Sequence, residues 1–197
     1  MGDIAGNDIG VLIRKEQNLV DPATRPKGLR YTDIADKLVL DHERIGQKAG
    51  KGWYDYDAKV GKGRVPMPSA AVADFIAAHR AGLGIKAQDF SELELQQRNL
   101  FPLVNEGFKI LKEGIAAHPS HIDIIYIYGY GFPVWRGGPM FWADKEVGLK
   151  EVLKVCEVNY AKYPGSEYWK PSDLLKECVE KDVSVYDYFD KGMGEKS

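Results

Sequence analysis

The stretch from Asn105 to Met140, NEGFKILKEGIAAHPSHIDIIYIYGYGFPVWRGGPM, decides the fold of the region around it. Apolar residues just before and within the first half of this stretch recur at intervals of close to three and four, which is typical of one face of an amphipathic helix. These residues are Phe101, Val104, Phe108, Leu111 and Ile115. The pattern predicts a long helix over 92–117, followed by a break at His118-Pro119.

A second helix, short and buried, is predicted after this break over the apolar run 122–128. Ser120 can cap it, with Asp123 three residues further on in an imperfect capping box. Glycines and prolines then follow too densely for regular structure. We therefore expect a stiff glycine-rich corner that carries Trp135 and Arg136.

The remaining sequence also predicts helices and contains no βαβ alternation, so the predicted fold class is all-α. Further helices are expected over 1–16, 32–39, 69–81, 147–160 and 171–181. The polar stretch 59–68, which is interrupted by Gly and Pro, is the best candidate for a linker.

Composition excludes several classes of protein. The 197 residues carry a net charge of −2, which argues against nucleic acid or an anionic membrane as a partner. No apolar run reaches the roughly 18–20 residues that span a membrane. Cys156 and Cys178 are most simply reduced and buried, as in an intracellular protein. No targeting signal is visible, since no signal peptide opens the sequence and the final Gly-Glu-Lys-Ser is not a peroxisomal address.

Three short segments recur in the same order along the chain, which predicts a duplicated helical unit. The pairs are Ile9-Gly10-Val11-Leu12 with Val147-Gly148-Leu149-Lys150, Asp33-Ile34-Ala35 with Asp173-Leu174-Leu175, and Tyr54-Asp55-Tyr56 with Tyr186-Asp187-Tyr188. We expect the remainder of a first repeat at 1–68, a connecting helix or linker at 69–91 and a second repeat at 92–197. The first repeat has no counterpart of the long helix, so Met1 is expected to be an internal methionine of a longer domain.

The basic loop Gly46-Gln-Lys48-Ala-Gly50-Lys51-Gly52 does not fit a phosphate-binding loop. That loop needs four residues between its glycines, and Ser or Thr at the position of Gly52. We expect a tight loop with glycines at positive φ, threaded beneath a neighbouring helix, whose lysines are solvated or cap carbonyls.

No residue pattern predicts catalysis, and none predicts a bound metal or cofactor. The histidines, His42, His79, His118 and His121, lie on separate segments, and no cysteine or carboxylate cluster completes a metal site. Glu106 and Glu113 share one face of the long helix, where they could act as acids or could simply belong to a solvated face. Arg136 could bind a carboxylate through its planar fork, but we expect it to pin two segments together. The aromatic residues Tyr126, Tyr128, Tyr130, Phe132, Trp135, Phe141 and Trp142 are expected to supply core and interface area.

Three stretches of the chain resemble one family. The stretch Arg44-Ile-Gly46-Gln-Lys48-Ala-Gly50-Lys-Gly52-Trp53-Tyr54 resembles R-x-G-x-K-x-G-x-G-[FW]-Y in the C-terminal domain of 3-hydroxyacyl-CoA dehydrogenases. The stretch from Asn105 to Met140 resembles the last domain of the peroxisomal-type multifunctional enzymes of β-oxidation, which join an enoyl-CoA hydratase/isomerase to this dehydrogenase. The first ten residues resemble the helix after the corner in that family's first C-terminal repeat. The similarity covers nearly the whole chain.

This resemblance implies a parent protein that oxidises 3-hydroxyacyl-CoA to 3-ketoacyl-CoA with NAD, in a peroxisome or a bacterial cytoplasm. The family's catalytic His and Glu, its substrate-contacting Asn and its NAD-binding glycines match no position here, and neither Asn99 nor Asn105 takes that role. The chain would support an active site formed with the NAD-binding domain and the acyl-CoA substrate of the parent, and would bind no NAD itself. Structural or interdomain roles are expected for Arg44, Gly46, Lys48, Gly50, Gly52, Trp53 and Arg136.

A non-catalytic assembly or regulatory module that keeps the fold is the alternative. For the chain by itself we also expect self-association, because the long helix would lack the matching helix of the first repeat. Its apolar side chains would then be uncovered, among them Phe101, Val104, Phe108 and Leu111.

Overall fold

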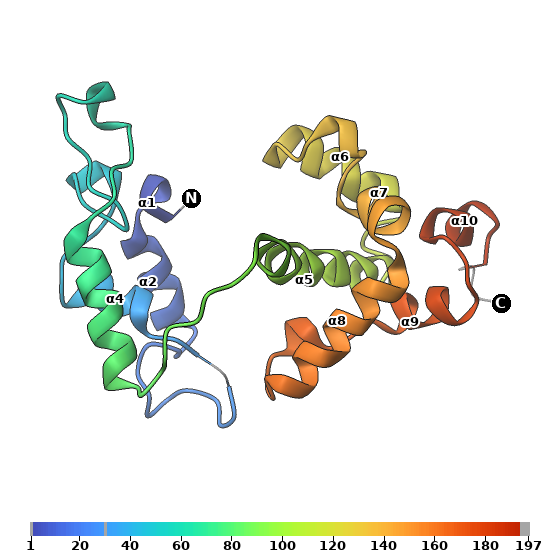
Figure 1. The fold of residues 1–197 in the computed structure, drawn as a ribbon, viewed down its shortest axis with the longest axis horizontal. Coiled ribbons are helices and arrows are strands. Elements are labelled where there is room, and N and C mark those ends of the chain that lie inside the picture. Colours follow the sequence, from blue (N-terminus) through green and yellow to red (C-terminus); the bar gives the residue numbers. More distant parts are fainter. Residues whose placement is uncertain (1, 30, 194–197) are drawn as a thin grey trace. The chain divides into compact units, whose positions relative to one another are not determined.

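The computed structural model describes residues 2–29 and 31–193, so the expectations about Met1 and the last four residues lie outside it. The chain divides into two compact units, Met1–Asp89 and Phe90–Ser197, and each is described by itself (Figure 1). The described residues form helices and no β-strand, with only isolated backbone bridges around Gly46–Met67. The predicted all-α class is therefore confirmed.

The first unit contains α1 (Gly2–Ala5), α2 (Asn7–Glu16), α3 (Ile34–Leu40) and α4 (Ala70–Gly82), with 3-10 turns η1 (Gln47–Ala49) and η2 (Gly61–Gly63). The prediction of one helix over 1–16 was wrong, because the chain breaks at Gly6, whose φ is +104°. The backbone N–H of Asn7 then donates to the carbonyl of Ile45, 2.7 Å away, instead of continuing a single helix. The break holds α1 beside the glycine-rich loop.

The boundary between the units differs from the one expected from the sequence. The stretch 59–68 is no linker, because the backbones of Asp55 and Met67 exchange hydrogen bonds of 2.9 and 3.0 Å across it. Helix α4, expected in a connecting segment, lies in the first unit.

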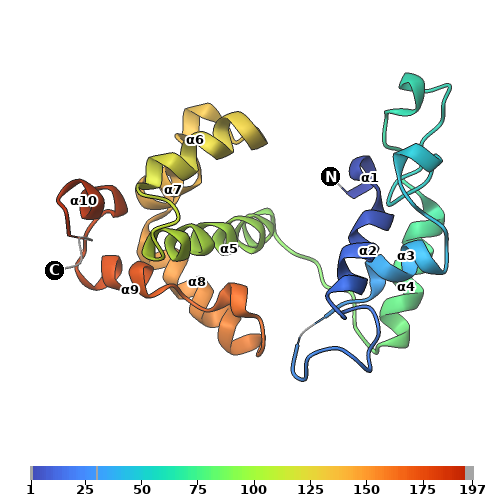
Figure 2. The same ribbon diagram turned by 180° about the vertical axis from the view of Figure 1, so that it is seen from behind.

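The second unit is built around α5 (Glu92–Lys112), which Figure 2 shows from behind. The other elements are α6 (Pro119–Tyr130), η3 (Val134–Arg136), α7 (Pro139–Trp142), the π-turn η4 (Ala143–Val147), α8 (Leu149–Lys162), η5 (Glu167–Trp169), α9 (Asp173–Glu180) and α10 (Val185–Asp190). Helix α5 ends five residues earlier than the predicted 117, where Gly114 adopts a φ of +74° and the N–H of Ile115 turns back to the carbonyl of Ile110.

The core of this unit lies where α5 packs against α8 and α9. Phe101, Val104, Phe108 and Leu111 are all buried there, together with Val152, Cys156, Leu174, Leu175 and Cys178. Burial of each large apolar side chain stabilises the fold by about 1.5–3 kcal/mol. The expectation that these four α5 side chains would be uncovered was therefore wrong, because α8 and α9 of the same unit cover them.

Helix α6 is exposed rather than buried, which also corrects a prediction. Pro119 and Ile122 face the core, whereas Ile124, Ile125 and Tyr128 lie in solvent. Helix α6 packs against its neighbours along one face only, so the apolar side chains on its other face are exposed to solvent. Among the described helices, none is both long and apolar enough to cross a bilayer.

Candidate functional site

Arg44 organises the glycine-rich loop of the first unit. Its guanidinium is buried, donates to the carbonyls of Gly52 at 2.6 Å and Tyr54 at 3.4 Å, and forms an ion pair with Asp55. The hydrogen bond from Arg44 is the main reason why the pKa of Asp55 lies below its ordinary value. A planar guanidinium with several donors suits this task, because it can donate to two loop carbonyls and a carboxylate at once.

A buried carboxylate, Asp3, holds the other side of this loop. It accepts hydrogen bonds from the backbone N–H groups of Trp53 at 2.8 Å and Tyr54 at 3.0 Å, and from the Tyr56 hydroxyl at 3.0 Å. Burial acts to raise the pKa of Asp3, but these hydrogen bonds outweigh burial and lower it. The sequence did not single out Asp3, because its partners lie about fifty residues away along the chain.

The loop glycines are required for two different reasons. Gly46 and Gly50 adopt φ values of +134° and +72°, where side chains are strained. Gly52 does not have a positive φ, which corrects the prediction for it. A Cβ there would instead lie 2.3 Å from the carboxylate of Asp3.

The loop lysines are held by acidic partners rather than capping carbonyls. Lys48 forms an ion pair of 2.7 Å with Asp8, and Lys51 lies 3.9 Å from Glu43. Trp53 is half-buried and lines a cleft of about 400 Å³ along α2, together with Gly6, Gly10 and Arg14.

Arg136 joins two segments of the second unit. Its guanidinium lies 3.3 Å from the carboxylate of Glu146 and stacks 4.5 Å from the ring centre of Trp135. The ion pair connects η3 to η4, and the side chain also borders a cleft with Gln96 and Gln97 of α5. Arg136 is about one-third exposed, so its remaining donors reach solvent.

Asp123 is the buried centre of the glycine-rich corner. It accepts hydrogen bonds from the backbone N–H of Met140 at 2.7 Å and of Phe141 at 3.3 Å, and from the Tyr186 hydroxyl. Burial raises the pKa of Asp123 against these hydrogen bonds. It makes no capping box; the α6 cap is the imidazole of His118, which accepts from the N–H of Ser120 at 3.3 Å.

The corner glycines fit this arrangement. Gly138 has a φ of +101°, and a Cβ there would lie 2.3 Å from the side chain of Asp123. The one carboxylate thus ties α6 to α7 and, through Tyr186, to α10. A lone acid inside an apolar run was the sequence signal that could have identified it, because a buried charge needs several partners.

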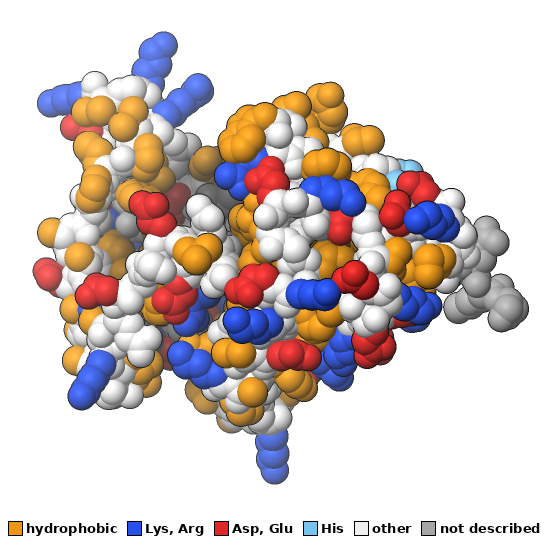
Figure 3. All heavy atoms as spheres, turned by 45° about the vertical axis from the view of Figure 1, so that its right-hand side comes forward, with side chains coloured by type: hydrophobic (Ala, Val, Ile, Leu, Met, Phe, Trp, Pro, Cys, Tyr) orange, Lys and Arg blue, Asp and Glu red, His pale blue; other side chains and the backbone are white. Residues whose placement is uncertain are grey.

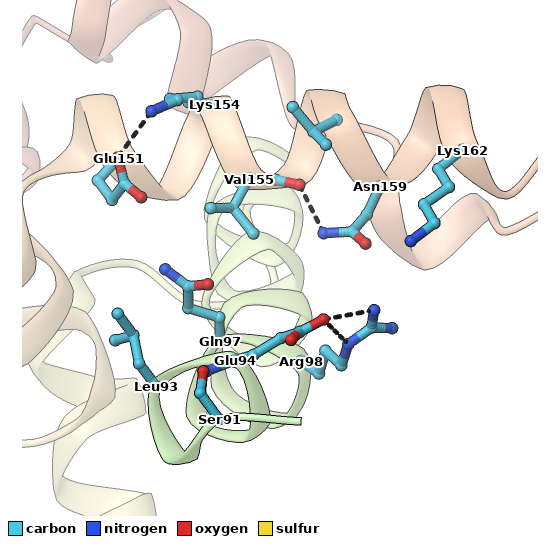
Figure 4. Close-up of a pocket in the computed structure, with 11 residues that line it drawn as sticks. Ser91, Leu93, Glu94, Gln97, Arg98, Glu151, Lys154, Val155, Asn159 and Lys162 are labelled. Atoms are coloured by element: carbon cyan, nitrogen blue, oxygen red, sulfur yellow. Dashed lines mark hydrogen bonds and ion pairs between the residues drawn. The ribbon is translucent and has the colours of Figure 1, made fainter. Parts of the chain in front are cut away.

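A cleft of about 390 Å³ lies between the start of α5 and α8 (Figure 4). Leu93, Val155 and Val158 give it an apolar surface. Four of its charged side chains form two ion pairs, with Arg98 2.9 Å from Glu94 and Lys154 3.7 Å from Glu151, and Lys162 also lines the cleft. Within residues 2–29 and 31–193, no cluster of His, Cys, Asp and Glu is arranged to hold a metal ion.

Residues 95–185, which run from α5 to the first residue of α10, match the family model described as 3-hydroxyacyl-CoA dehydrogenase, C-terminal domain. This part of the chain is a 3-hydroxyacyl-CoA dehydrogenase C-terminal domain. The resemblance noted from the sequence is confirmed.

The relatives are longer proteins. The chain is 41% identical to the peroxisomal bifunctional enzyme of Danio rerio, over 92% of this chain and 26% of that protein. It is 34% identical to the glyoxysomal fatty acid beta-oxidation multifunctional protein MFP-a of Brassica napus, over 77% of this chain and 20% of that protein. The dehydrogenase part of multifunctional enzyme 1 from C. elegans is similar in structure, with a TM-score of 0.63 and 27% identity over 89% of this chain and 37% of that one. The chain spans about a quarter of the length of the curated relatives that it matches.

Proposed function

We propose that this chain is the C-terminal helical part of an NAD-dependent 3-hydroxyacyl-CoA dehydrogenase of fatty-acid β-oxidation. The parent would oxidise 3-hydroxyacyl-CoA to 3-ketoacyl-CoA, with the hydride passing to NAD. The observation that carries the proposal is the family match over 95–185 together with 41% identity to a peroxisomal bifunctional enzyme along most of the chain. The names of the relatives support β-oxidation as the process and the peroxisome as the compartment.

In this proposal the chain supports the active site and does not supply its reacting groups. The buried carboxylates Asp3 and Asp123 accept hydrogen bonds that hold segments of the fold in place. NAD would be bound by a separate domain of the parent, and that domain is the proposed partner of this chain. Trp53, which the Arg44 and Asp3 contacts hold in the glycine-rich loop, is the proposed interdomain contact.

We further propose that the two units are repeats of one design. In the first unit Asp3 lies just before α2 and holds the segment Trp53-Tyr54-Asp55-Tyr56. In the second, Asp144 lies just before α8 and accepts a 2.5 Å hydrogen bond from Ser184, which begins the segment Val185-Tyr186-Asp187-Tyr188. In both units an aspartate shortly before a helix accepts a hydrogen bond from the region of the Tyr-Asp-Tyr segment, although the donor groups differ, and this similarity supports the repeat.

The helix faces support this proposal as well. Helix α8 packs against both α5 and α9, whereas α2 packs mainly against α3 and leaves Ile9, Leu12 and Ile13 about half exposed. A helix equivalent to α5 would cover that α2 face in a complete repeat. The chain with its α2 face open is also proposed to self-associate, since such surfaces favour pairing in water.

The proposed interdomain role can be tested by complex formation. Co-expression of this chain with a tagged first three-quarters of the Danio rerio relative is expected to give an equimolar complex. Trp53→Ala should weaken the complex, whereas Tyr168→Ala, at a half-exposed tyrosine of the second unit, should leave it intact. Failure of the two parts to copurify would contradict the proposed partner, and equal complex yields for both variants would contradict the role of Trp53.

A further inference from the structure

A cleft of about 340 Å³ lies at the start of α9, and we name it the α9 cleft. Lys109 and Lys112 of α5 line it, together with Lys170 from the segment before α9. Ser172, the residue directly before the helix, lines it as well. The function proposed above makes no use of these side chains.

The first turn of α9 carries backbone donors without acceptors. The N–H of Lys176 makes the first bond of the helix, to the carbonyl of Ser172 at 3.1 Å. No acceptor among the residues that the structure describes takes the N–H groups of Asp173, Leu174 and Leu175. Free N–H groups and the positive end of the helix dipole together favour an anion at such a turn.

The serine before this turn leaves it uncapped. Ser91 and Ser184, which precede α5 and α10, accept the N–H groups of Glu94 and Tyr186, each at 3.2 Å. The Ser172 hydroxyl makes no such cap and has no other hydrogen-bond partner in the described part of the chain. Although Ser172 is only 5% exposed, its oxygen is not sealed inside the protein, so the hydroxyl opens into the cleft that the residue lines. A ligand oxygen in the cleft would supply the missing partner.

We propose that the α9 cleft binds a phosphate group. The phosphate oxygens accept hydrogen bonds from the N–H groups of the first turn and from the Ser172 hydroxyl, while Lys109 and Lys112 approach from α5. A phosphate suits this set of donors better than a carboxylate does, because it offers three strong acceptor oxygens. The cleft of about 340 Å³ also leaves room for a small organic group on the phosphate, since ligand pockets begin at about 300 Å³.

Hydrogen-bond donors, rather than net charge, carry this recognition. Three carboxylates line the cleft and equal its lysines in number, namely those of Glu113, Glu167 and Asp173. Figure 3 likewise shows Lys and Arg side chains interspersed with Asp and Glu over the second unit, rather than collected in a basic patch. Lys109 is held at the cleft because it donates to the carbonyl of Glu167 at 3.1 Å. Lys112 has only a loose partner, Glu177 at 3.9 Å, so its ammonium group can turn to a bound anion. With the charges balanced, binding in the millimolar range is expected.

Titration of the purified full chain with inorganic phosphate, followed by amide NMR spectroscopy, tests this inference. The amide signals of Asp173, Leu174 and Leu175 are expected to shift and saturate with phosphate, but not with sodium chloride of equal ionic strength. Lys112→Gln should weaken binding by about threefold to tenfold, because it removes a cation from beside the anion. The matched control Lys154→Gln, at another exposed and loosely paired lysine, should leave binding unchanged.

Two further variants separate a built site from a general attraction to lysines. Ser172→Ala should weaken phosphate binding without lowering the melting temperature, because the hydroxyl does not cap α9. Asp173→Asn should tighten it, because the variant lacks the carboxylate nearest the turn. AMP in place of inorganic phosphate identifies the source: tighter binding of AMP indicates a phosphate ester, and equal binding indicates the phosphate group alone. Absence of saturable shifts at α9, or equal weakening by Lys112→Gln and Lys154→Gln, would overturn the proposal, and neither result bears on the dehydrogenase assignment.

Discussion

Replacing Asp123 with Ala should destabilise the second unit strongly, because one carboxylate serves three donors. In Asp123→Ala the N–H of Met140, a fully buried residue, and the hydroxyl of Tyr186 lose their acceptor. An unsatisfied buried donor costs about 1–3 kcal/mol. Because the Tyr186 hydroxyl is only partly buried and contributes less than the N–H of Met140, the two together predict a loss of about 2–5 kcal/mol in unfolding free energy. Asp123→Asn keeps one acceptor oxygen for Met140 and should lose only about 1 kcal/mol.

Urea denaturation measures this difference. Three of the four tryptophans, Trp135, Trp142 and Trp169, lie in the second unit, so their fluorescence reports mainly on its unfolding. Circular dichroism at the same urea concentrations shows whether the first unit unfolds separately. If Asp123→Ala unfolds within 0.5 kcal/mol of the wild type, at about the spread of ordinary surface substitutions, the buried acceptor is not what holds the corner.

The pH dependence of the same variants tests the burial of this carboxyl. Burial raises the folded-state pKa of Asp123. Its contribution to stability is therefore complete below the unfolded pKa of about 3.9 and is lost as pH rises through the folded value. The stability gap between the wild type and Asp123→Asn should accordingly be widest in acid and narrow towards neutral pH. A gap that widens as pH rises would show that hydrogen bonding, and not burial, sets the folded-state pKa of Asp123.

Three further predictions concern the rest of the fold. The pKa of Asp3 is lowered in the folded protein, so its contribution to the unfolding free energy is present above the unfolded pKa of about 3.9 and is lost as pH falls through the folded value. In Asp3→Asn the stability of the first unit should therefore fall less steeply at acid pH. An unchanged fall would refute this. Gly52→Ala should cost about 1–3 kcal/mol in thermal or urea unfolding, because its Cβ meets Asp3, whereas Gly82→Ala, with open space around it, should cost nothing; equal stabilities would contradict the steric argument. Burial raises the pKa of Cys156 and of Cys178 to about 12. Neither thiol should therefore react with a disulfide reagent until urea unfolds the chain. Rapid labelling of the native protein would show that the thiols are not buried.

Local patterns in the sequence predicted most of the helices. The spacing of Phe101, Val104 and Phe108 predicted the buried face of α5, because helical periodicity needs no knowledge of distant segments. The predicted helix over 69–81 likewise agrees with α4 to within one residue at each end. The family resemblance rested on motifs of the same local kind, which is why it too could be recognised.

Other features depend on contacts between distant residues. Asp123 has the spacing of a cap residue, but its partners Met140 and Tyr186 are 17 and 63 positions away, and only the folded corner brings them together. The exposure of α6 was missed because an apolar run predicts burial without showing what covers it. The break at Gly6 was missed for a similar reason, since the Ile45 carbonyl that receives the N–H of Asn7 lies in a later loop.

NADH formation by a complex of this chain with the Danio rerio relative is the decisive test of the proposed supporting role. The purified chain is expected to produce no NADH from 3-hydroxyacyl-CoA and NAD, and the first three-quarters of the Danio rerio relative without its C-terminal part is expected to produce little. Their co-expressed complex should restore the 340 nm signal, and complexes containing Asp123→Ala should restore less. A complex that forms without restoring NADH production would instead support a non-catalytic assembly module. NADH production by the chain alone would contradict the proposal that it supplies no reacting groups.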